Sequence, residues 1–440
     1  MKETDMHADV LDVRISRRQL LVDTAATGTA LLLGGSRVFA AAADEEIRVG
    51  FISPQSGPLG QFGQSDPYVI DLARKALAQG IEVGGRRYRV TILNRDSQSS
   101  PSRASQLANE LITKHKVHLM LATSSPEVVN PVADACEAAG VPSLGTSCPL
   151  ESFFFGRGGK VGEPSPFKWT FCFSFDVAQF VAMYLSAWNE LPTNRKVAAL
   201  YPNDADGNAY REHVAPALEK GGYKIIDPGA YEDGTTDYSS QIALFNRENC
   251  QVFNCVSLTP DFNTFWRQAA QLRYLDKVRV AQLSKTGEFP SQIQQLGVLG
   301  YGLLIGAYWA PVFPWKSPLT GQSSQQMTDA YEKAMNRQWN QQFGASLSLL
   351  EVGAAVLKAA KDPTSRSAIR DVIPTLDMIT TAGPVNFKVG PYPNTTPTVI
   401  VGAQWVKAPA GSRYPQDLVT IGNKGAPAVP VQRKLAPFRV

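Results

Sequence analysis

The residues with the clearest chemical potential are three consecutive hydroxyls, Thr123, Ser124 and Ser125, directly before Pro126. An apolar strand is expected to end just before them, and a helix is expected to begin at the proline. Backbone N–H groups and hydroxyls at a helix start can bind a carboxylate without a lysine or arginine, aided by the helix dipole. The alternative is that Ser125 only caps the helix, as serine often does. The residues alone leave both interpretations open.

Three glycines at a spacing of three, Gly57, Gly60 and Gly63, follow an earlier expected strand. A phosphate-binding loop would need either a following lysine and hydroxyl or a compact βαβ unit with a later acid. Neither follows, and Pro58 removes one of the backbone donors that such a loop would use. We therefore expect no nucleotide and no cofactor at this loop.

Motifs for catalysis and metal binding are not evident. The sequence has no Gly-x-Ser-x-Gly elbow, no His-Glu-x-x-His and no Cys-x-x-Cys. His115 and His118 stand without an acid partner, and His213 falls on an expected helix. Five cysteines leave at least one unpaired, and Cys250 and Cys255 flank one expected strand too far apart to bridge. We expect a protein that is not an enzyme and holds no metal.

The elements that must position these residues alternate between strand and helix. Amphipathic helices are expected at 67–79, 103–115 and 126–139, and later at 322–340, 347–361 and from 365. Apolar or alternating runs predict strands at 47–53, 88–94, 117–122, 141–145, 169–173, 196–201, 223–227, 251–257, 278–283 and 302–310. The pattern restarts near Arg195, so it predicts an α/β fold of two doubly wound, parallel-sheet lobes.

Composition and the first residues indicate an exported globular protein. The 440 residues are 44% hydrophobic and 19% charged, and the net charge of +4 is spread without a basic run, which argues against a nucleic-acid partner. Arg17 and Arg18 precede a weakly apolar stretch that ends in small residues. This pattern predicts a twin-arginine signal over residues 1–43, and no cysteine for lipid attachment follows it. We expect the mature protein to be free in a periplasm.

Five segments in order resemble the solute-binding proteins of branched-chain-amino-acid-type ABC transporters. They are "VGFISPQSGPLGQFG", "LATSSPEVVNPVADACEAAGVPSLGTS", "RKVAALYPNDADGNA", "GTTDYSSQIALFNRENCQVFNC" and "GPVNF". The resemblance implies a type I periplasmic binding fold, with two lobes joined by a hinge that the chain crosses three times. One lobe would comprise residues 47–172 and 307–384, and the other residues 173–306 and 385–440.

The resemblance also implies which residues contact a solute between the lobes. Phe62 occupies the family's aromatic position, and the turn at Gly145 matches a second carboxylate-holding loop. The expected ligand contacts are Phe62, Thr123, Ser124, Ser125, Gly145, Thr146, Ser147, Asp206, Thr259, Thr286, Glu288 and Tyr308.

The second lobe departs from the pattern of amino-acid binders. Asp206 stands where these proteins usually carry a tyrosine before the glycine, and the acid that pairs the ligand's α-ammonium aligns at or near Thr286 or Glu288. If Glu288 faces the cleft, an amino acid retains an ammonium partner. If Thr286 does, Asp206 must take that role or the ligand has no amine.

The expected function is therefore capture of a small carboxylate, a branched-chain or related amino acid, for delivery to a membrane permease by a monomeric binding protein. Two alternatives stay open. One is the same role for an aromatic or other organic acid without an amine, and the other is the ligand-sensing domain of a regulatory system.

Overall fold

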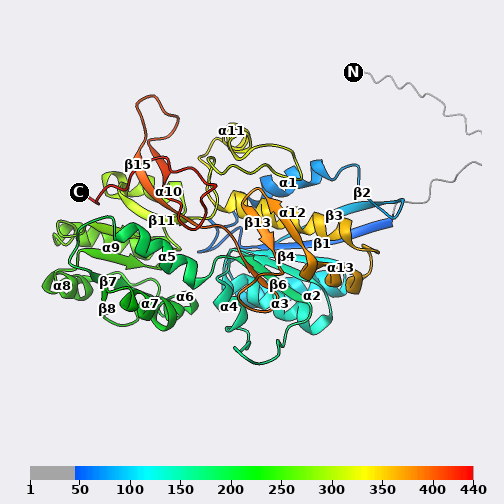
Figure 1. Ribbon diagram of the computed structural model, residues 1–440, viewed down its shortest axis with the longest axis horizontal. Coiled ribbons are helices and arrows are strands. Elements are labelled where there is room, and N and C mark those ends of the chain that lie inside the picture. Colours follow the sequence, from blue (N-terminus) through cyan, green and yellow to red (C-terminus); the bar gives the residue numbers. More distant parts are fainter. Residues whose placement is uncertain (1–44, 440) are drawn as a thin grey trace, which may run out of the picture. The chain divides into compact units, whose positions relative to one another are not determined.

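The computed structural model describes residues 45–439, and the expected export signal at residues 1–43 lies outside them. Two seven-stranded sheets and a short hairpin organise the described chain (Figure 1). Strands alternate with helices in the sequence, as the apolar runs predicted, and most neighbouring strands are parallel. The expected α/β class with two parallel-dominant sheets is confirmed.

The first sheet has the order β14-β6-β5-β4-β1-β3-β2. Only β2 runs antiparallel to its neighbour, β3. The strands are β1 (Glu45–Ser53), β2 (Ile81–Val83), β3 (Arg86–Asp96), β4 (Leu119–Thr123), β5 (Ser143–Thr146), β6 (Thr170–Ser174) and β14 (Thr395–Pro397).

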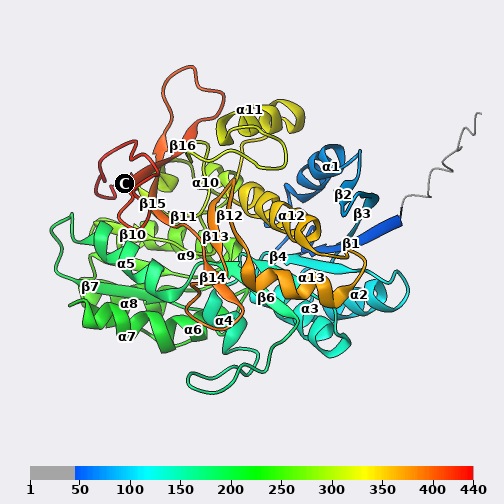
Figure 2. The same ribbon diagram turned by 45° about the vertical axis from the view of Figure 1, so that its right-hand side comes forward.

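Helices cover both faces of the first sheet, and alternation along β4 shows how. Leu119 and Leu121 belong to the core that includes α1 (Asp66–Ala76) and α12 (Gln342–Ala359), whereas Met120 and Ala122 pack with α2 (Pro101–Thr113) and α3 (Pro126–Ala139). The turned view in Figure 2 separates these two layers. A strand buried on both faces is apolar throughout, which explains its continuous apolar sequence.

The second sheet has the order β16-β15-β11-β10-β9-β7-β8. Its parallel strands are β7 (Lys196–Leu200), β8 (Lys224–Ile226), β9 (Val252–Cys255), β10 (Val280–Gln282) and β11 (Leu303–Ala307), and its antiparallel edge is formed by β15 (Val401–Lys407) and β16 (Gln416–Gly422). On one face pack α5 (Val177–Trp188), α7 (Ala215–Lys220) and the π-helical turn η1 (Tyr210–Val214). On the other face pack α8 (Ser239–Arg247), α9 (Thr259–Gln271) and α10 (Pro290–Leu296).

The remaining elements are short or peripheral. They are α4 (Leu150–Phe154), α6 (Ala205–Ala209), α11 (Ser324–Met335), α13 (Arg366–Val372), the 3₁₀ turns η2 (Gly297–Gly300) and η3 (Ile373–Thr375), and the hairpin of β12 (Asp377–Thr380) with β13 (Gly383–Asn386). No helix within residues 45–439 combines the length and the apolar character that crossing a membrane requires. All five cysteines are buried and free.

The chain changes sheet after β6, after β11 and after β14. The third change differs from the expected lobe boundary at 384/385, because Thr395 to Pro397 pair in parallel with β6 of the first sheet. The first lobe, as the term is used below, comprises the first sheet with its helices, and the second lobe comprises the second sheet with its helices. Parallel strands bring the loops at their carboxyl ends to one edge of each sheet, where ligands bind in open α/β folds.

Candidate ligand-binding site

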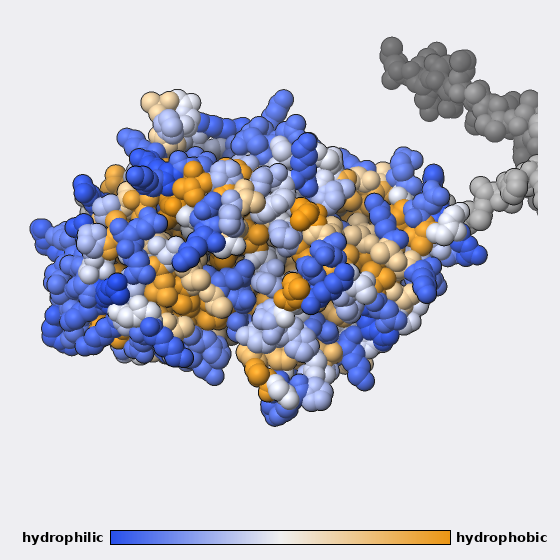
Figure 3. Space-filling view, viewed as in Figure 1, coloured by the Kyte–Doolittle hydropathy of each residue, from blue (hydrophilic) through white to orange (hydrophobic). Residues whose placement is uncertain are grey.

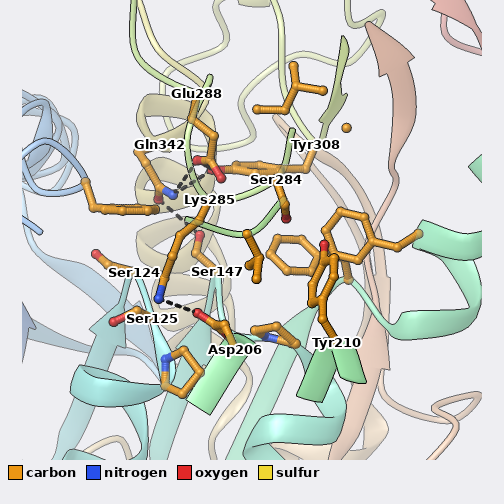
Figure 4. Close-up of a pocket in the computed structure, with 18 residues that line it drawn as sticks. Ser124, Ser125, Ser147, Asp206, Tyr210, Ser284, Lys285, Glu288, Tyr308 and Gln342 are labelled. Atoms are coloured by element: carbon orange, nitrogen blue, oxygen red, sulfur yellow. Dashed lines mark hydrogen bonds and ion pairs between the residues drawn. The ribbon is translucent and has the colours of Figure 1, made fainter. Parts of the chain in front are cut away.

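A cavity lies between the two lobes and is lined by both. Its free volume is about 40 Å³, far below the roughly 300 Å³ of a typical small-molecule site. Side chains thus fill most of the space between the lobes. The lining residues are Phe62, Ser124, Ser125, Pro126, Ser147, Pro149, Phe175, Phe180, Asp206, Tyr210, Val256, Ser284, Lys285, Glu288, Ile305, Gly306, Tyr308 and Gln342 (Figure 4).

Ser124 and Ser125 form one end of the cavity, between β4 and α3. Ser125 is the N-cap residue of α3, yet its side chain accepts no capping hydrogen bond. Both serines are nearly fully buried, and neither hydroxyl has a partner. Buried hydroxyls are normally satisfied, so this pair requires an explanation. The interpretation of Ser125 as a mere cap is therefore not supported, whereas an anion seat at the start of a 14-residue helix remains.

Two serines that line the cavity, Ser124 and Ser147, have unusual backbone conformations. The φ angle of Ser124 is 116° and that of Ser147 is 55°, a region that non-glycine residues seldom adopt. Such conformations cost on the order of 1–3 kcal/mol each and gather at functional sites. Ser124 directly follows β4 and Ser147 directly follows β5, so both unusual conformations occur at strand ends.

A hydrogen-bonded chain links the two lobes across the cavity. Ser147 Oγ donates to Gln342 Oε1 over 3.1 Å, and Gln342 Nε2 donates to Tyr308 OH over 2.6 Å and to Glu288 Oε2 over 3.2 Å. Tyr308 OH also donates to Glu288 Oε2. Burial raises the pKa of Glu288 to about 7, although the hydrogen bonds from Tyr308 and Gln342 act in the opposite direction. Glu288 is therefore partly protonated at neutral pH.

An ion-pair cluster with Lys285 at its centre also spans the lobes. Lys285 Nζ lies 2.7 Å from Asp206 Oδ2, 3.0 Å from Asp204 Oδ2 and 3.9 Å from Glu127 Oε1, and its side chain is only 7% exposed. Glu127 belongs to the first lobe, in the first turn of α3, and the others belong to the second. Figure 4 shows the Lys285 ammonium directed at Asp206, and Lys285 lines the same cavity as Ser124 and Ser125.

The charges in this cluster are mutually dependent. Burial alone lowers the pKa of Lys285, but the carboxylates of Asp206, Glu127 and Asp204 outweigh it and keep the pKa well above its usual range. Burial raises the pKa of Asp206 to about 6, which still leaves it mainly ionised at neutral pH. The three carboxylates lie within 4.8 Å of one another, a spacing that could hold a metal ion. The ammonium of Lys285 is the cation that they share.

The rest of the lining is aromatic and aliphatic. The ring of Phe175 lies 5.5 Å from that of Tyr308 and 4.8 Å from that of Phe180, measured between centroids. Phe62 reaches the cavity from the glycine-containing loop after β1 and meets Phe289 of the second lobe edge to face, with centroids 4.8 Å apart. The cavity thus offers hydroxyls at one end and an apolar wall for the body of a small ligand.

The expected contact residues divide into two groups. Those that line the cavity are Phe62, Ser124, Ser125, Ser147, Asp206, Glu288 and Tyr308. Those that do not are Thr123, Gly145, Thr146, Thr259 and Thr286.

Each residue of the second group has a structural reason for lying elsewhere. Thr123 pairs with Thr146 and Ala122 with Gly145, so these positions end the strands β4 and β5 within the sheet. Thr259 begins α9. The Thr286 hydroxyl is fully buried against the side chain of Gln292, so of the two aligned candidates it is Glu288 that faces the cavity.

Among the polar residues that line the cavity, sequence reasoning missed Tyr210, Ser284, Lys285 and Gln342. Ser284 and Lys285 follow β10 closely, so their place at the carboxyl end of a parallel strand was an available signal. The sequence offered no such signal for Gln342, because this residue begins α12 without a recognisable motif and its hydrogen-bond partner Ser147 is 195 residues away.

A larger hollow of about 450 Å³ lies beside α5, between that helix and the edge strands β15 and β16. Apolar surface is visible over this part of the molecule in Figure 3. The hollow is lined mainly by the second lobe, so closing the lobes would not enclose a ligand there. The cavity between the lobes is therefore the stronger candidate.

Comparisons with known proteins agree with this architecture. The sequence matches the periplasmic binding protein family over residues 46–398. Comparison with curated proteins gave no match. The fold is similar to that of the leucine-binding protein LivK from Thermotoga maritima, with 17% identity, a TM-score of 0.68 and coverage of 86% of this chain and 99% of that one.

Two further solved structures differ in their ligands. The substrate-binding protein LivJ from Streptococcus pneumoniae, in complex with isoleucine, has 16% identity, a TM-score of 0.66 and coverage of 86% and 100%. An ABC-transporter solute-binding protein from Rhodopseudomonas palustris, in complex with 3,4-dihydroxybenzoic acid, has 16% identity, a TM-score of 0.69 and coverage of 86% and 99%. The resemblance drawn from the sequence is confirmed: the chain belongs to the periplasmic binding protein family and has the type I fold of its leucine- and isoleucine-binding members.

Proposed function

We propose that this protein captures a small carboxylate between its two lobes and delivers it to the permease of an ABC importer. The observation that carries the proposal is the pair of buried, unpartnered hydroxyls of Ser124 and Ser125 at the start of α3, facing a cavity that both lobes line. A carboxylate seated there would satisfy both hydroxyls and meet the positive end of the helix dipole, an interaction of roughly 0.3 to 2 kcal/mol.

Closure of the lobes would couple ligand binding to recognition of the protein by the permease. Two contacts bridge the lobes, the hydrogen bond between Gln342 and Glu288 and the ion pair between Glu127 and Lys285, and both would break if the lobes separated. A ligand that touches both lobes has more contacts in the closed form and so shifts the equilibrium toward it. The closed protein would then dock on the permease as a monomer.

The remaining parts of the proposal follow from the family and from the first residues. Family membership implies a location outside the cytoplasm and a binding function. We propose export by the twin-arginine route, on the basis of Arg17 and Arg18. Two ligand classes remain: Glu288 in the cavity favours an amino acid, whereas the engagement of Asp206 by Lys285 favours an acid without an amine.

Replacement of the two serines tests the carboxylate seat. The double variant Ser124→Ala/Ser125→Ala should bind carboxylates at least about tenfold more weakly in calorimetric titration, since two charge-assisted hydrogen bonds are lost. Its ligand-free melting temperature should not fall, because neither hydroxyl has a partner in the protein.

Ser100→Ala is the matched control, since Ser100 does cap its helix, α2, by accepting a hydrogen bond from the backbone of Arg103. That variant should melt earlier and bind normally. Unchanged carboxylate affinity in the double variant would remove α3 from the site.

A further inference from the structure

The cavity already contains a cation that belongs to the protein. Lys285 contacts Asp206 at 2.7 Å and Asp204 at 3.0 Å, and its ammonium lies 3.9 Å from Glu127, which is two residues after Ser125 in the chain. An amino acid whose carboxylate sat on Ser124 and Ser125 would place its own ammonium within a few ångströms of them. That region is where the lysine ammonium lies.

We propose that Lys285 takes the place of the ligand's ammonium group, so that the physiological ligand is a carboxylic acid without an amine. The inference rests on the proposed function, because it assumes the carboxylate seat at the start of α3. It makes Lys285 a specificity-determining residue that excludes amino acids.

The two acids nearest to Lys285 already have a cationic partner. Asp204 uses Oδ1 to cap α6, accepting from Gly207 N over 2.6 Å, and uses Oδ2 for Lys285. Asp206 Oδ2 is held by Lys285 at the shortest distance in the cluster. An amino acid would have to displace the buried lysine from Asp206 Oδ2 or place its own ammonium beside the lysine ammonium, where like charges repel.

Glu288 is the remaining acid that lines the cavity, and one of its two oxygens is already engaged. Its Oε2 atom accepts from both Tyr308 OH and Gln342 Nε2. Burial raises the pKa of this carboxyl to about 7, so Glu288 can carry a proton when an anion binds nearby. Phe175, Phe180 and Tyr308 then surround an apolar or aromatic ligand body.

Matched ligand pairs test the inference on the unmodified protein. The two pairs are leucine with 4-methylpentanoate and phenylalanine with 3-phenylpropanoate, which differ only in the α-ammonium. After removal of any co-purified ligand by unfolding and refolding, calorimetric titration should show that the amine-free member of at least one pair binds about tenfold or more tightly than its amino acid. Equal or tighter binding of the amino acids overturns the inference while leaving the carboxylate seat intact.

Failure of all four probes calls for a wider thermal-shift panel of amino acids and amine-free carboxylates. Stabilisation by amine-free acids alone supports the inference, and stabilisation by any amino acid to an equal or greater degree overturns it. Stabilisation by neither class overturns the proposed function and, with it, the inference.

Two substitutions then assign the selectivity to a residue. Lys285→Met should weaken binding of the amine-free acid and narrow or reverse its preference over the amino acid, because Asp206 becomes free for an ammonium. Lys196→Met is the matched control, since Lys196 pairs with Glu248 on the second lobe away from the cavity, and it should leave the preference unchanged.

If Lys285→Met does not fold, Asp206→Asn decides instead. Lys285 then keeps Asp204 as its partner, and the preference for the amine-free acid should persist. Loss of all binding selectivity in Asp206→Asn, or an unchanged preference in a folded Lys285→Met, contradicts the role given to Lys285.

Discussion

Replacing Phe289 with alanine should weaken ligand binding without any loss of ligand contact, because Phe289 does not line the cavity. Its ring packs edge to face on Phe62 of the opposite lobe at an interplanar angle of 80°. Together with Leu59 and the partly buried Leu258, the two rings form a small apolar cluster that bridges the lobes. Opening the lobes would separate Phe62 and Leu59 from Phe289 and Leu258.

The magnitude follows from burial in the closed state. Phe62 is 5% exposed and Phe289 is 3% exposed. Full burial of a phenylalanine contributes roughly 1.5–3 kcal/mol and an edge-to-face pair about 0.5–1.5 kcal/mol more. Since Phe289 keeps part of its burial within its own lobe after opening, closure should lose about 1–3 kcal/mol, which weakens apparent affinity roughly 5- to 150-fold.

Calorimetric titration and small-angle scattering measure the two consequences. The Phe289→Ala variant should need more ligand to saturate, and its ligand-free radius of gyration should be equal to or larger than that of the unmodified protein. Phe289→Leu should lose less, because an apolar side chain of similar bulk remains. Leu296→Ala, in the adjacent helix α10, is the control: Leu296 is 5% exposed, so the variant should unfold more easily yet bind normally.

One outcome would refute the reasoning. If Phe289→Ala binds ligand within about twofold of the unmodified protein and shows the same scattering change on binding, the apolar cluster does not contribute to closure. The lobes would then be held by the polar contacts of Glu288 and Lys285 alone.

Three further predictions concern protonation, packing and thiols. The pKa of Glu288 is raised from 4.5 to about 7 in the folded protein. The contribution of Glu288 to stability is therefore fully present below pH 4.5 and is lost as pH rises through 7. In denaturant titrations, the stability of Glu288→Gln relative to the unmodified protein should rise by about 2 kcal/mol between pH 5 and 8. Gly207→Ala should destabilise the fold by about 1–3 kcal/mol, because a Cβ there would collide with the carbonyl oxygen of Pro202, whereas Gly422→Ala meets nothing and should be neutral. All five thiols are buried, so Ellman's reagent should label none in the native protein and five after unfolding.

Much of the fold was predictable because its sheets are buried on both faces. Strands such as β4 must then be apolar along their whole length, and turn residues mark where they end. The strand β14 escaped prediction because it carries no apolar signal. Residues 395–397 read Thr-Thr-Pro, and both threonines are buried although neither is apolar. The proline is tolerated because β14 is an edge strand.

The site was predictable only where one segment determines it. Ser124, Ser125 and Ser147 could be named because each closely follows a strand whose end the sequence marks. The role of Lys285 could not be predicted, although its place just after β10 could, because that role depends on Glu127 from the other lobe and on the fold of the loop that carries Asp204 and Asp206. Whether a serine hydroxyl caps a helix or is left without a partner is likewise a matter of side-chain geometry, which residue types do not specify.

The three changes of sheet have a consequence for how the chain can be assembled. The first sheet receives its edge strand β14 only at residues 395–397, and the second is completed by β15 and β16, up to Gly422. Neither half can therefore finish its own hydrogen-bonded array while the ribosome is still making the middle of the chain. Pairings over such long sequence separations are entropically slow to form. Maturation should accordingly be a late, concerted event, and chains truncated before residue 395 should accumulate as incomplete, protease-sensitive species.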